Sequence, residues 1–575
     1  MIRSAKAFAL LLLVVPALLF AQTGKPQGHG EGLEPADILR PLSDSWPTYS
    51  GDYSGKRYSA LTQINQANVK NLALAWVTRV TGGPGPGGLA AAALAQRRPA
   101  PGASRFIVGG EGTGELFAGG ATNVRSAVLA VNGILYFTTP DNAWAVDARD
   151  GHEIWHYYWK TKGGTHIGNR GVGMWKHYLF METPDDYLIS LDARTGEERW
   201  HKEISSFAQE YFSTMAPIVV GNHVLVGTGN DLDAPGFLQS FDPETGGLQW
   251  KLYTVPMNPG DPGLESWKSL DAARHGGAQV WVPGSYDPET HLYITGTGNP
   301  TPAYTSQTRG EGDNLFTCSI IAVNVDTGKM QWYYQTSPHD THDWDSAQTP
   351  VLIDAPFGGR TRKLVLTASR NGYYFTLDRT TGEHLVTGRF SDTVNWSTGL
   401  NSKGQPVRDP KKDYDIGGAL VSSGNGGAAN WPPGSFSPDT GFFYVPLAES
   451  WAMYYLAELD PRGAMGLGGK DEIGLGGETF LAAIDYRTGK VAWKMRYPTV
   501  TGAGGSSNGV LTTAGRLLFA ADAGGNFVAR DPANGRPLWH ARIGNVSNAP
   551  ETYMLDGHQY ILVAAGDSLY AFTLN

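Results

Sequence analysis

Residues 339 to 348, HDTHDWDSAQ, place His339, Asp340, His342, Asp343 and Asp345 close together in a chain that is only 17% charged. Carboxylates and imidazoles at this spacing are compatible with three roles. They can form a solvated acidic loop, they can bind a metal ion, or one carboxylate can act as a general base. The segment alone leaves all three roles open.

The composition favours one large repetitive domain and argues against nucleic acid as a partner. The chain has 575 residues, 45 Lys and Arg against 54 Asp and Glu, and a net charge of -9. No Ser/Pro-rich linker divides it. No basic run or basic helical face supplies the positive surface that nucleic-acid binding requires.

The N-terminus has the features of a secretory signal. In MIRSAKAFALLLLVVPALLFAQ, Arg3 and Lys6 precede an apolar run from 7 to 20, and the small residue Ala21 follows. A membrane anchor is the alternative, but the run is shorter than the roughly 20 residues of a spanning helix. We therefore expect a signal peptide at 1–21, an extension at 22–44, a periplasmic or secreted product, and no membrane span after cleavage.

The chain contains a single cysteine, Cys318, within the apolar run NLFTCSIIAVNV, where we expect a buried strand. No disulfide can form within one chain, and no CxxCH motif exists in the sequence for covalent haem attachment.

A repeat organises the sequence. A short apolar strand runs into Asp or Asn, a turn closes with Gly, and the next strand usually carries Trp. The glycine supplies the positive φ that a tight turn demands. The copies are AVDARDGHEIW (145–155), SLDARTGEERW (190–200), SFDPETGGLQW (240–250), AVNVDTGKMQW (322–332), TLDRTTGEHLV (376–386), AIDYRTGKVAW (483–493) and ARDPANGRPLW (529–539).

The spacing of the repeats predicts a β-propeller. Trp155, Trp200 and Trp250 lie 45 and 50 residues apart, which is the length of a four-stranded blade. With NVKNLALAW, which ends at Trp76, the chain has eight candidate blades. We therefore predict an all-β, eight-bladed propeller over 45–575, closed by YILVAAGDSLYAFTLN, in which the repeated Trp side chains dock between neighbouring blades.

The opening stretch SWPTYSGDYSGKRYSALTQINQANVKNLALAW (45–76) and the Trp repeats together resemble the quinoprotein alcohol dehydrogenases. These eight-bladed propellers bind pyrroloquinoline quinone (PQQ) and a calcium ion on the ring axis. The resemblance implies oxidation of an alcohol by hydride transfer to PQQ, and a separate electron acceptor such as a soluble cytochrome c. Repeats alone are weak evidence, because assembly scaffolds with the same blades bind no quinone.

More specific residues carry the resemblance. In GGAQVWVPGSYDPETHLYITGTGNP (276–300), Trp281 matches the indole beneath the quinone, and Asn299 matches an amide ligand of calcium. The WD pair of HDTHDWDSAQ matches the segment of the catalytic base, which implies that role for Asp345. In VGTGNDLDAPG (226–236), Asp231 falls at the position of a metal-binding glutamate.

The metal implied is calcium, acting as a Lewis acid, with Asp231, Asn299 and Asp345 as ligands. In lanthanide-using relatives a further acid lies two positions beyond the catalytic aspartate, where this chain has Ala347. Further cofactor contacts implied by the resemblance are Arg170, Arg370, Thr214, Thr228, Gly229 and Asn430. Any one of the last four, taken alone, fits a surface or packing role equally well.

For the other acidic and imidazole groups of HDTHDWDSAQ we expect structural roles. Asp340, His342 and Asp343 should cap turns or line the entrance. A zinc site from His339 and His342 is the weaker alternative, because no nearby residues complete a set of ligands.

Two departures from the family pattern keep other functions open. Gly164 and Thr165 replace adjacent cysteines above the quinone, and Arg125 replaces an acid near it. A propeller without PQQ, serving as a binding or assembly scaffold, is the principal alternative. A metal-dependent pocket that acts without quinone is a third. Residues 446–480 are expected to form a loop, either a cover over the pocket or an excursion between blades.

Overall fold

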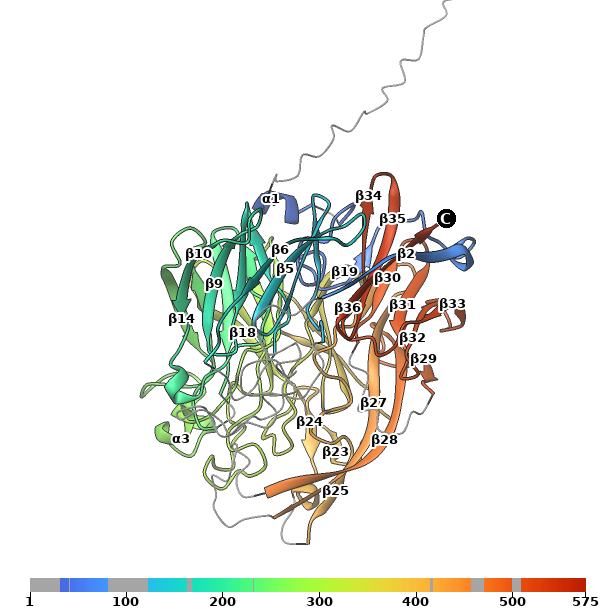
Figure 1. The fold of residues 1–575 in the computed structure, drawn as a ribbon. Helices are drawn as coiled ribbons and strands as arrows, with labels where there is room; N and C mark the ends of the chain where they lie inside the picture. Colours follow the sequence, from blue (N-terminus) through green and yellow to red (C-terminus); the bar gives the residue numbers. More distant parts are fainter. Residues whose placement is uncertain are drawn as a thin grey trace, which may run out of the picture.

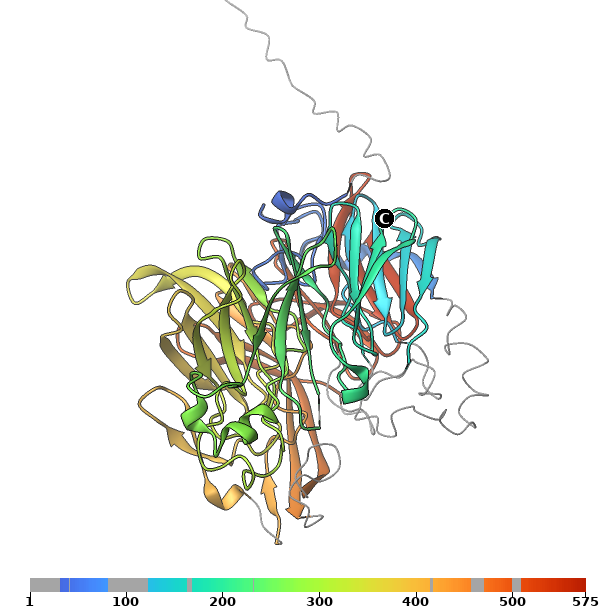
Figure 2. The same ribbon diagram turned by 90° about the vertical axis from the view of Figure 1, so that its left-hand side faces the viewer.

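The computed structural model describes residues 32–40, 42–80, 123–162, 168–230, 232–413, 417–456, 470–498 and 508–575. The expected signal peptide, residues 163–167 with Gly164 and Thr165, and Asp231 lie outside these ranges. The regular secondary structure of the described residues is almost entirely β and includes eight sheets of four or five strands (Figures 1 and 2). The predicted all-β propeller is therefore confirmed.

Six of the sheets are built from consecutive strands. They comprise β3 (Leu129–Val131), β4 (Ile134–Thr139), β5 (Asn142–Asp147) and β6 (Glu153–Tyr158); β7 (Gly173–Trp175), β8 (Tyr178–Glu182), β9 (Tyr187–Asp192) and β10 (Glu198–Glu203); β11 (Ile218–Val220), β12 (His223–Thr228), β13 (Phe237–Phe241) and β14 (Leu248–Tyr253); β15 (Ser285–Asp287), β16 (Leu292–Gly296), β17 (Ser319–Asn324) and β18 (Met330–Gln335); β19 (Val351–Phe357), β20 (Arg360–Ala368), β21 (Tyr373–Asp378) and β22 (His384–Arg389); and β25 (Ala419–Val421), β26 (Ser435–Ser437), β27 (Phe442–Leu456), β28 (Lys470–Asp485) and β29 (Val491–Arg496).

The other two sheets combine strands from both ends of the chain. One contains β1 (Tyr58–Ser59) with β30 (Leu511–Thr513), β31 (Leu517–Ala521), β32 (Asn526–Arg530) and β33 (Pro537–Arg542); the other contains β2 (Leu72–Arg79) with β34 (Glu551–Leu555), β35 (His558–Ala565) and β36 (Ser568–Leu574). The remaining elements are the hairpin β23 (Ser397–Leu400) and β24 (Pro406–Arg408), helices α1 (Pro35–Ile38) and α3 (Leu270–Arg274), and 3-10 turns η1 (Val69–Asn71), η2 (Phe207–Gln209), η3 (Leu264–Ser266) and η4 (Pro410–Lys412).

The repeated Trp side chains dock between sheets, as predicted. Each indole N–H donates to a backbone carbonyl in the turn of the next sheet, at 2.7 to 3.2 Å. The repeat glycine of that turn packs against the same indole, and a Cβ at Gly196 would lie 2.7 Å from the ring of Trp155. The docked sets are Trp76 with Ala148 and Gly151, Trp155 with Ala193 and Gly196, Trp200 with Glu244 and Gly246, Trp250 with Val325 and Gly328, Trp332 with Arg379 and Gly382, and Trp493 with Pro532 and Gly535.

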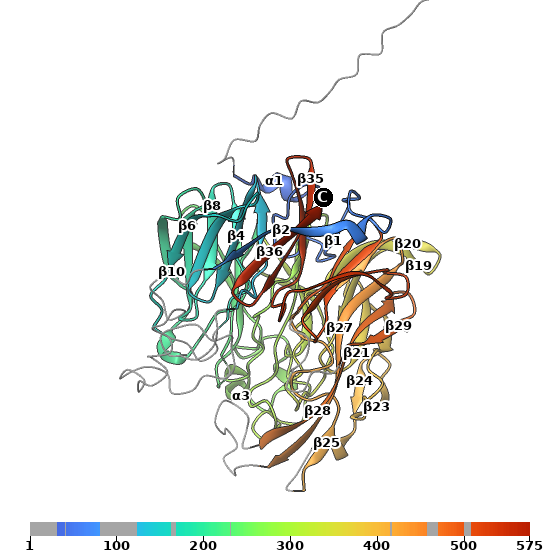
Figure 3. The same cartoon turned by 45° about the vertical axis from the view of Figure 1, so that its right-hand side comes forward.

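The two ends of the chain close the ring. Strand β2 pairs antiparallel with β36 from Leu72 opposite Leu574 to Arg79 opposite Ser568, and Figure 3 shows the blue strand beside the red one. Trp539 extends the docking pattern across this junction, because its indole N–H donates to the carbonyl of Leu72 at 3.0 Å. The predicted closing role of the C-terminal segment is therefore confirmed.

A buried cation fixes the same junction. Arg57 is fully buried and donates to the carbonyls of Tyr49, Val510 and Pro550 at 2.8, 3.1 and 2.6 Å. Its guanidinium lies 3.8 Å from Glu551, also buried. Burial raises the pKa of Glu551 to about 8, although the charge of Arg57 acts to lower it. These contacts join segments from both ends of the chain.

Cys318 is fully buried, as predicted, and lies one residue before β17.

The prediction of a loop at 446–480 is wrong for the described residues. Strands β27 and β28 pair from Phe442 opposite Asp485 to Leu456 opposite Lys470 and form a long hairpin (Figure 1). The aromatic and branched side chains of 442–456 favour a strand, and this outweighs the Gly and Met content. Residues 457–469 lie outside the described ranges.

Among the described residues, no helix has both the length and the apolar character needed to cross a membrane.

Candidate active site

Segments between strands bring the candidate residues together. Trp281 lies before β15, Asn299 follows β16, Asp345 lies between β18 and β19, and Arg370 follows β20. Long connections in a propeller carry function while the sheets hold them in place. Residues distant in sequence therefore meet at one site.

The carboxylate of Asp345 is the centre of the cluster. Its side chain is 7% exposed. Oδ1 accepts the backbone N–H of Asn299 at 2.5 Å, and Oδ2 accepts the indole N–H of Trp281 at 2.9 Å. A guanidinium nitrogen of Arg370 lies 3.1 Å from Oδ2. Four residues singled out in the sequence thus share one buried site.

The glycines of the GTGN segment permit this close approach. A Cβ at Gly296 would lie 1.7 Å from the carbonyl oxygen of Ser346, and one at Gly298 would lie 3.3 Å from Asp345 Oδ1. The backbone N–H of Ser346 donates to the carbonyl of Thr297 at 3.1 Å. Side chains at these glycines would push the Asn299 segment away from Asp345.

Trp281 presents a half-buried indole close to two guanidinium groups. The guanidinium carbons of Arg170 and Arg370 lie 6.0 and 5.5 Å from the ring centroid. The hydroxyl of Thr214 donates to the carbonyl of Trp281 at 3.2 Å. The indole is thus fixed through its N–H and its backbone, and offers a flat surface in a cationic setting.

Arg370 is held between two carboxylates. It lies 3.4 Å from Asp343 and 3.1 Å from Asp345, and it donates to the carbonyl of Asp343 at 2.7 Å. Burial by itself would lower the pKa of Arg370, but Asp345 and Asp343 raise it overall. The cation therefore stays charged and favours the ionised form of Asp345.

The remaining groups of HDTHDWDSAQ have structural contacts. Asp340 Oδ2 accepts the backbone N–H groups of Asp343 and Trp344 at 2.9 and 3.1 Å, so Asp340 caps a turn as predicted. Burial raises its pKa to about 6. The ring of His342 stacks on Trp344 with centroids 4.3 Å apart, and His339 Nδ1 lies 2.8 Å from the carbonyl of Gly312.

Two of the three proposed metal ligands can be placed. Asn299 Nδ2 donates to the carbonyl of Pro300 at 2.9 Å, so Oδ1 is the atom of this side chain that could serve as a metal ligand. Its neighbour Asp345 supplies carboxylate oxygens. Asp231 is outside the described ranges, within which no group of three His, Cys, Asp or Glu side chains is arranged to hold a metal.

Thr228 and Gly229 have contacts within the fold. The Thr228 hydroxyl lies 2.8 Å from Asp186 Oδ1 and 2.7 Å from the carbonyl of Phe212. Gly229 exchanges backbone hydrogen bonds with Phe212 at 3.1 Å. The buried carboxyl of Asp186, whose pKa is raised to about 7 by burial, competes for this hydroxyl. The Thr228 hydroxyl is therefore engaged within the fold.

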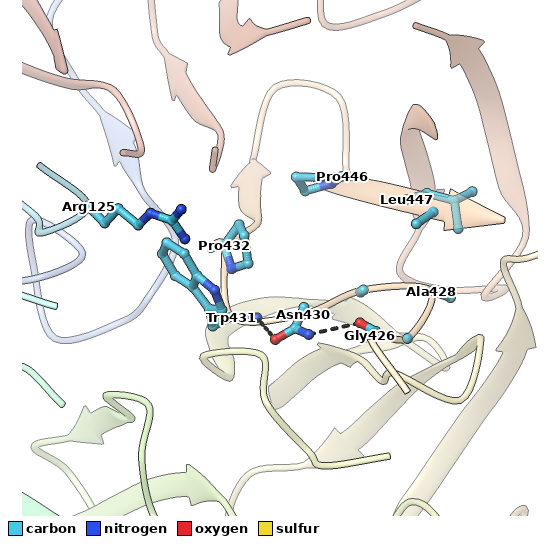
Figure 4. A pocket seen from close by; sticks show the side chains of 11 residues that line it. Arg125, Gly426, Ala428, Asn430, Trp431, Pro432, Pro446 and Leu447 are labelled. Atoms are coloured by element: carbon cyan, nitrogen blue, oxygen red, sulfur yellow. Dashed lines mark hydrogen bonds between the residues drawn. The ribbon is translucent and has the colours of Figure 1, made fainter. Parts of the chain in front are cut away.

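Asn430 lies beside a residue that the sequence reasoning missed. The Arg170 guanidinium stacks on the ring of Trp431, 3.9 Å from its centroid. Asn430 and Trp431 line a cavity together with Arg125 (Figure 4). Trp431 is one of ten tryptophans outside the Trp repeat, so its position alone carried no specific signal. Gln348, also missed, donates to the carbonyl of Pro432 at 2.9 Å.

Comparisons with known proteins show which family the chain resembles. Residues 46–389 match the family model described as the β-propeller domain of glucose, ethanol and alcohol dehydrogenases. Residues 477–575 match the model of the outer membrane protein assembly factor BamB. A quinohemoprotein alcohol dehydrogenase of Comamonas testosteroni is 32% identical over 96% of this chain and 77% of its own length.

Two further relatives extend the comparison. A quinoprotein alcohol dehydrogenase of Pseudomonas putida is 31% identical over 89% of this chain and 84% of its own length. The crystal structure of the Comamonas testosteroni quinohemoprotein alcohol dehydrogenase superposes with a TM-score of 0.79 at 29% identity, and covers 94% of this chain and 82% of the other.

Proposed function

Because this chain belongs to the PQQ-dependent quinoprotein alcohol dehydrogenase family, we propose that it oxidises an alcohol or a similar hydroxyl compound at the site built around Asp345. The observation that carries this proposal is the convergence of Trp281, Asn299 and Arg370 on one buried carboxylate. A binding scaffold has no physical need for these residues to converge on one buried carboxylate.

The residues present fit PQQ, a planar quinone with three carboxyl groups. We assign Trp281 to the surface beneath its rings, and Arg170 and Arg370 to its oxygen atoms, since guanidinium groups bind carboxylate and carbonyl oxygens well. Thr214, Thr228, Gly229 and Asn430 are further proposed contacts. When bound, PQQ supplies a two-electron acceptor for the hydride of the alcohol carbon.

Calcium is the proposed metal, with Asn299 Oδ1, Asp345 and Asp231 as its protein ligands. Calcium takes about 6 to 8 oxygen ligands, so three residues leave positions for the cofactor and for water. When bound, the ion supplies a Lewis acid beside the substrate.

Asp345 is the proposed general base. Arg370 and the indole N–H of Trp281 favour its ionised form, so the carboxylate is ready to accept a proton. The same contacts fix its orientation, and a substrate hydroxyl placed within hydrogen-bond distance transfers its proton to the carboxylate.

The cellular setting is part of the proposal. The signal at residues 1–21 directs the enzyme to the periplasm or the medium. A separate carrier, such as a soluble cytochrome c, is the proposed electron acceptor.

Reconstitution tests the function. The purified protein should oxidise alcohols with an artificial dye as acceptor only when both PQQ and Ca²⁺ are added, since neither the electron acceptor nor the Lewis acid is a side chain. Omission of either one is the control. If the folded protein takes up no PQQ at micromolar concentration, the scaffold function replaces the enzymatic one.

The metal assignment has its own test. Asn299→Ala and Asp231→Ala should each raise the Ca²⁺ concentration for half-maximal activity by about 10-fold or more, because each removes one oxygen ligand. Asp313→Ala, outside the proposed ligand set, is the control. An unchanged Ca²⁺ requirement in both ligand variants would refute this set.

A further inference from the structure

A cavity of about 250 Å³ lies beside the Asp345 cluster and has a single charged residue in its wall. Arg125 supplies that charge, Trp431 and Pro432 lie next to its guanidinium, and Leu447 closes the apolar side (Figure 4). None of the residues that line this cavity, within the described part of the chain, is acidic. Its volume suits a small organic group together with a few waters.

The backbone on both sides of Arg125 is fixed. The N–H of Val124 donates to the carbonyl of Gly566 at 2.8 Å, and Ser547 donates to the carbonyl of Val124 at 2.8 Å. The hydroxyl of Ser126 donates to the carbonyl of Thr138 at 2.9 Å. Val124 and Ser126 are both fully buried, while Arg125 is half-buried. The guanidinium is thus directed into the cavity from a rigid support, which reduces the entropy lost on binding.

The segment 426–431, which also lines the cavity, is equally well supported. Asn430 Nδ2 donates to the carbonyl of Gly426 at 2.8 Å, and Asn430 Oδ1 accepts the N–H of Trp431 at 2.7 Å (Figure 4). The N–H of Ala428 donates to the carbonyl of Arg370 at 2.7 Å. The cavity is therefore part of the same rigid unit as the Asp345 cluster.

Charge and shape together define the ligand. Arg170 stacks on Trp431, so a second guanidinium adds positive potential close to the cavity. A guanidinium beside an indole and apolar walls recognises a carboxylate on a flat or apolar group, through charge-assisted hydrogen bonds and stacking. We infer that this cavity is a binding subsite for an organic carboxylate, with Arg125 as its anchor.

The carboxylate has two possible sources, the quinone cofactor or a small acid such as a carboxylated substrate. The chemistry at Arg125 is the same for both, so the subsite does not depend on the proposed enzymatic function. Titration calorimetry of the cofactor-free protein distinguishes them, with PQQ as one probe, benzoate as a second, and benzyl alcohol as the neutral analogue of benzoate.

Arg125→Gln should weaken carboxylate binding by about 10- to 100-fold, because one charge-assisted pair is lost, and should leave benzyl alcohol binding unchanged. Arg125→Lys should give an intermediate loss, since it keeps the charge without the planar fork. Arg360→Gln, at an exposed arginine that begins β20, is the matched control and should change nothing.

If Arg125→Gln loses affinity for PQQ alone, the carboxylate belongs to the cofactor. If it loses affinity for benzoate alone, the carboxylate belongs to a small acid. Either result, or a loss of affinity for both probes, supports the subsite. The inference is overturned if Arg125→Gln, folded with the melting temperature of the wild type, binds both probes as the wild type does. It is also overturned if the wild type binds neither probe.

Discussion

Asp345→Asn is expected to lower the rate of alcohol oxidation by about 100- to 10,000-fold, the usual contribution of a general base. The amide keeps the size of the side chain and retains an oxygen that accepts one of its two N–H partners, Asn299 or Trp281. It has no basic oxygen to take the proton. Steady-state kinetics with saturating PQQ and Ca²⁺ measure this loss.

Loss of fold must be separated from loss of chemistry. Removing the Asp345 charge leaves Arg370 paired with Asp343 alone, so thermal unfolding and PQQ titration accompany the kinetics. Asp343→Asn is the matched control, because it removes the other carboxylate that contacts Arg370, and it should cost less than 10-fold in rate. An Asp345→Asn enzyme with more than a tenth of the wild-type rate would exclude Asp345 as the base.

Trp281→Ala is expected to weaken PQQ binding by about 10- to 100-fold, because the flat surface beneath the cofactor is lost. Trp281→Phe separates the two roles of the indole. Phenylalanine keeps an aromatic plane but cannot donate to Asp345, so it should retain most of the PQQ affinity while lowering kcat. Quenching of protein fluorescence by PQQ gives the affinities.

Trp200→Ala provides the matched control for a tryptophan of the docking repeat. Its indole donates to the carbonyl of Glu244 between two sheets, so the substitution should lower the melting temperature and leave PQQ affinity unchanged. If Trp281→Ala binds PQQ as tightly as Trp200→Ala, the indole does not form the cofactor surface.

The fold was largely predictable because its information is local and repeated. Each docking Trp and the glycine of the next turn occupy fixed positions in a short motif, and the structure pairs them through a hydrogen bond and direct packing. The long hairpin of β27 and β28 was mistaken for a loop, because the Gly and Met content of 446–480 was weighted above the aromatic and branched residues of 442–456, which favour a strand.

The site was predictable only in part. Trp281, Asn299 and Asp345 stand in recognisable segments, and the structure brings them together. The hydroxyl of Thr228 donates a hydrogen bond to Asp186, a buried carboxyl that comes from another sheet. Arg125 and Trp431 line the same cavity although they are far apart in the chain. Such contacts follow from tertiary packing and leave no pattern in either segment alone.

The visible absorption spectrum of the protein purified from its own host, with quantitation of PQQ released on denaturation, tests the central claim most directly. We predict the absorption of a bound quinone and about one PQQ per chain, the stoichiometry of a single site at Trp281. A folded protein that shows no quinone absorption, releases no PQQ, and acquires none when PQQ and Ca²⁺ are added would contradict the claim.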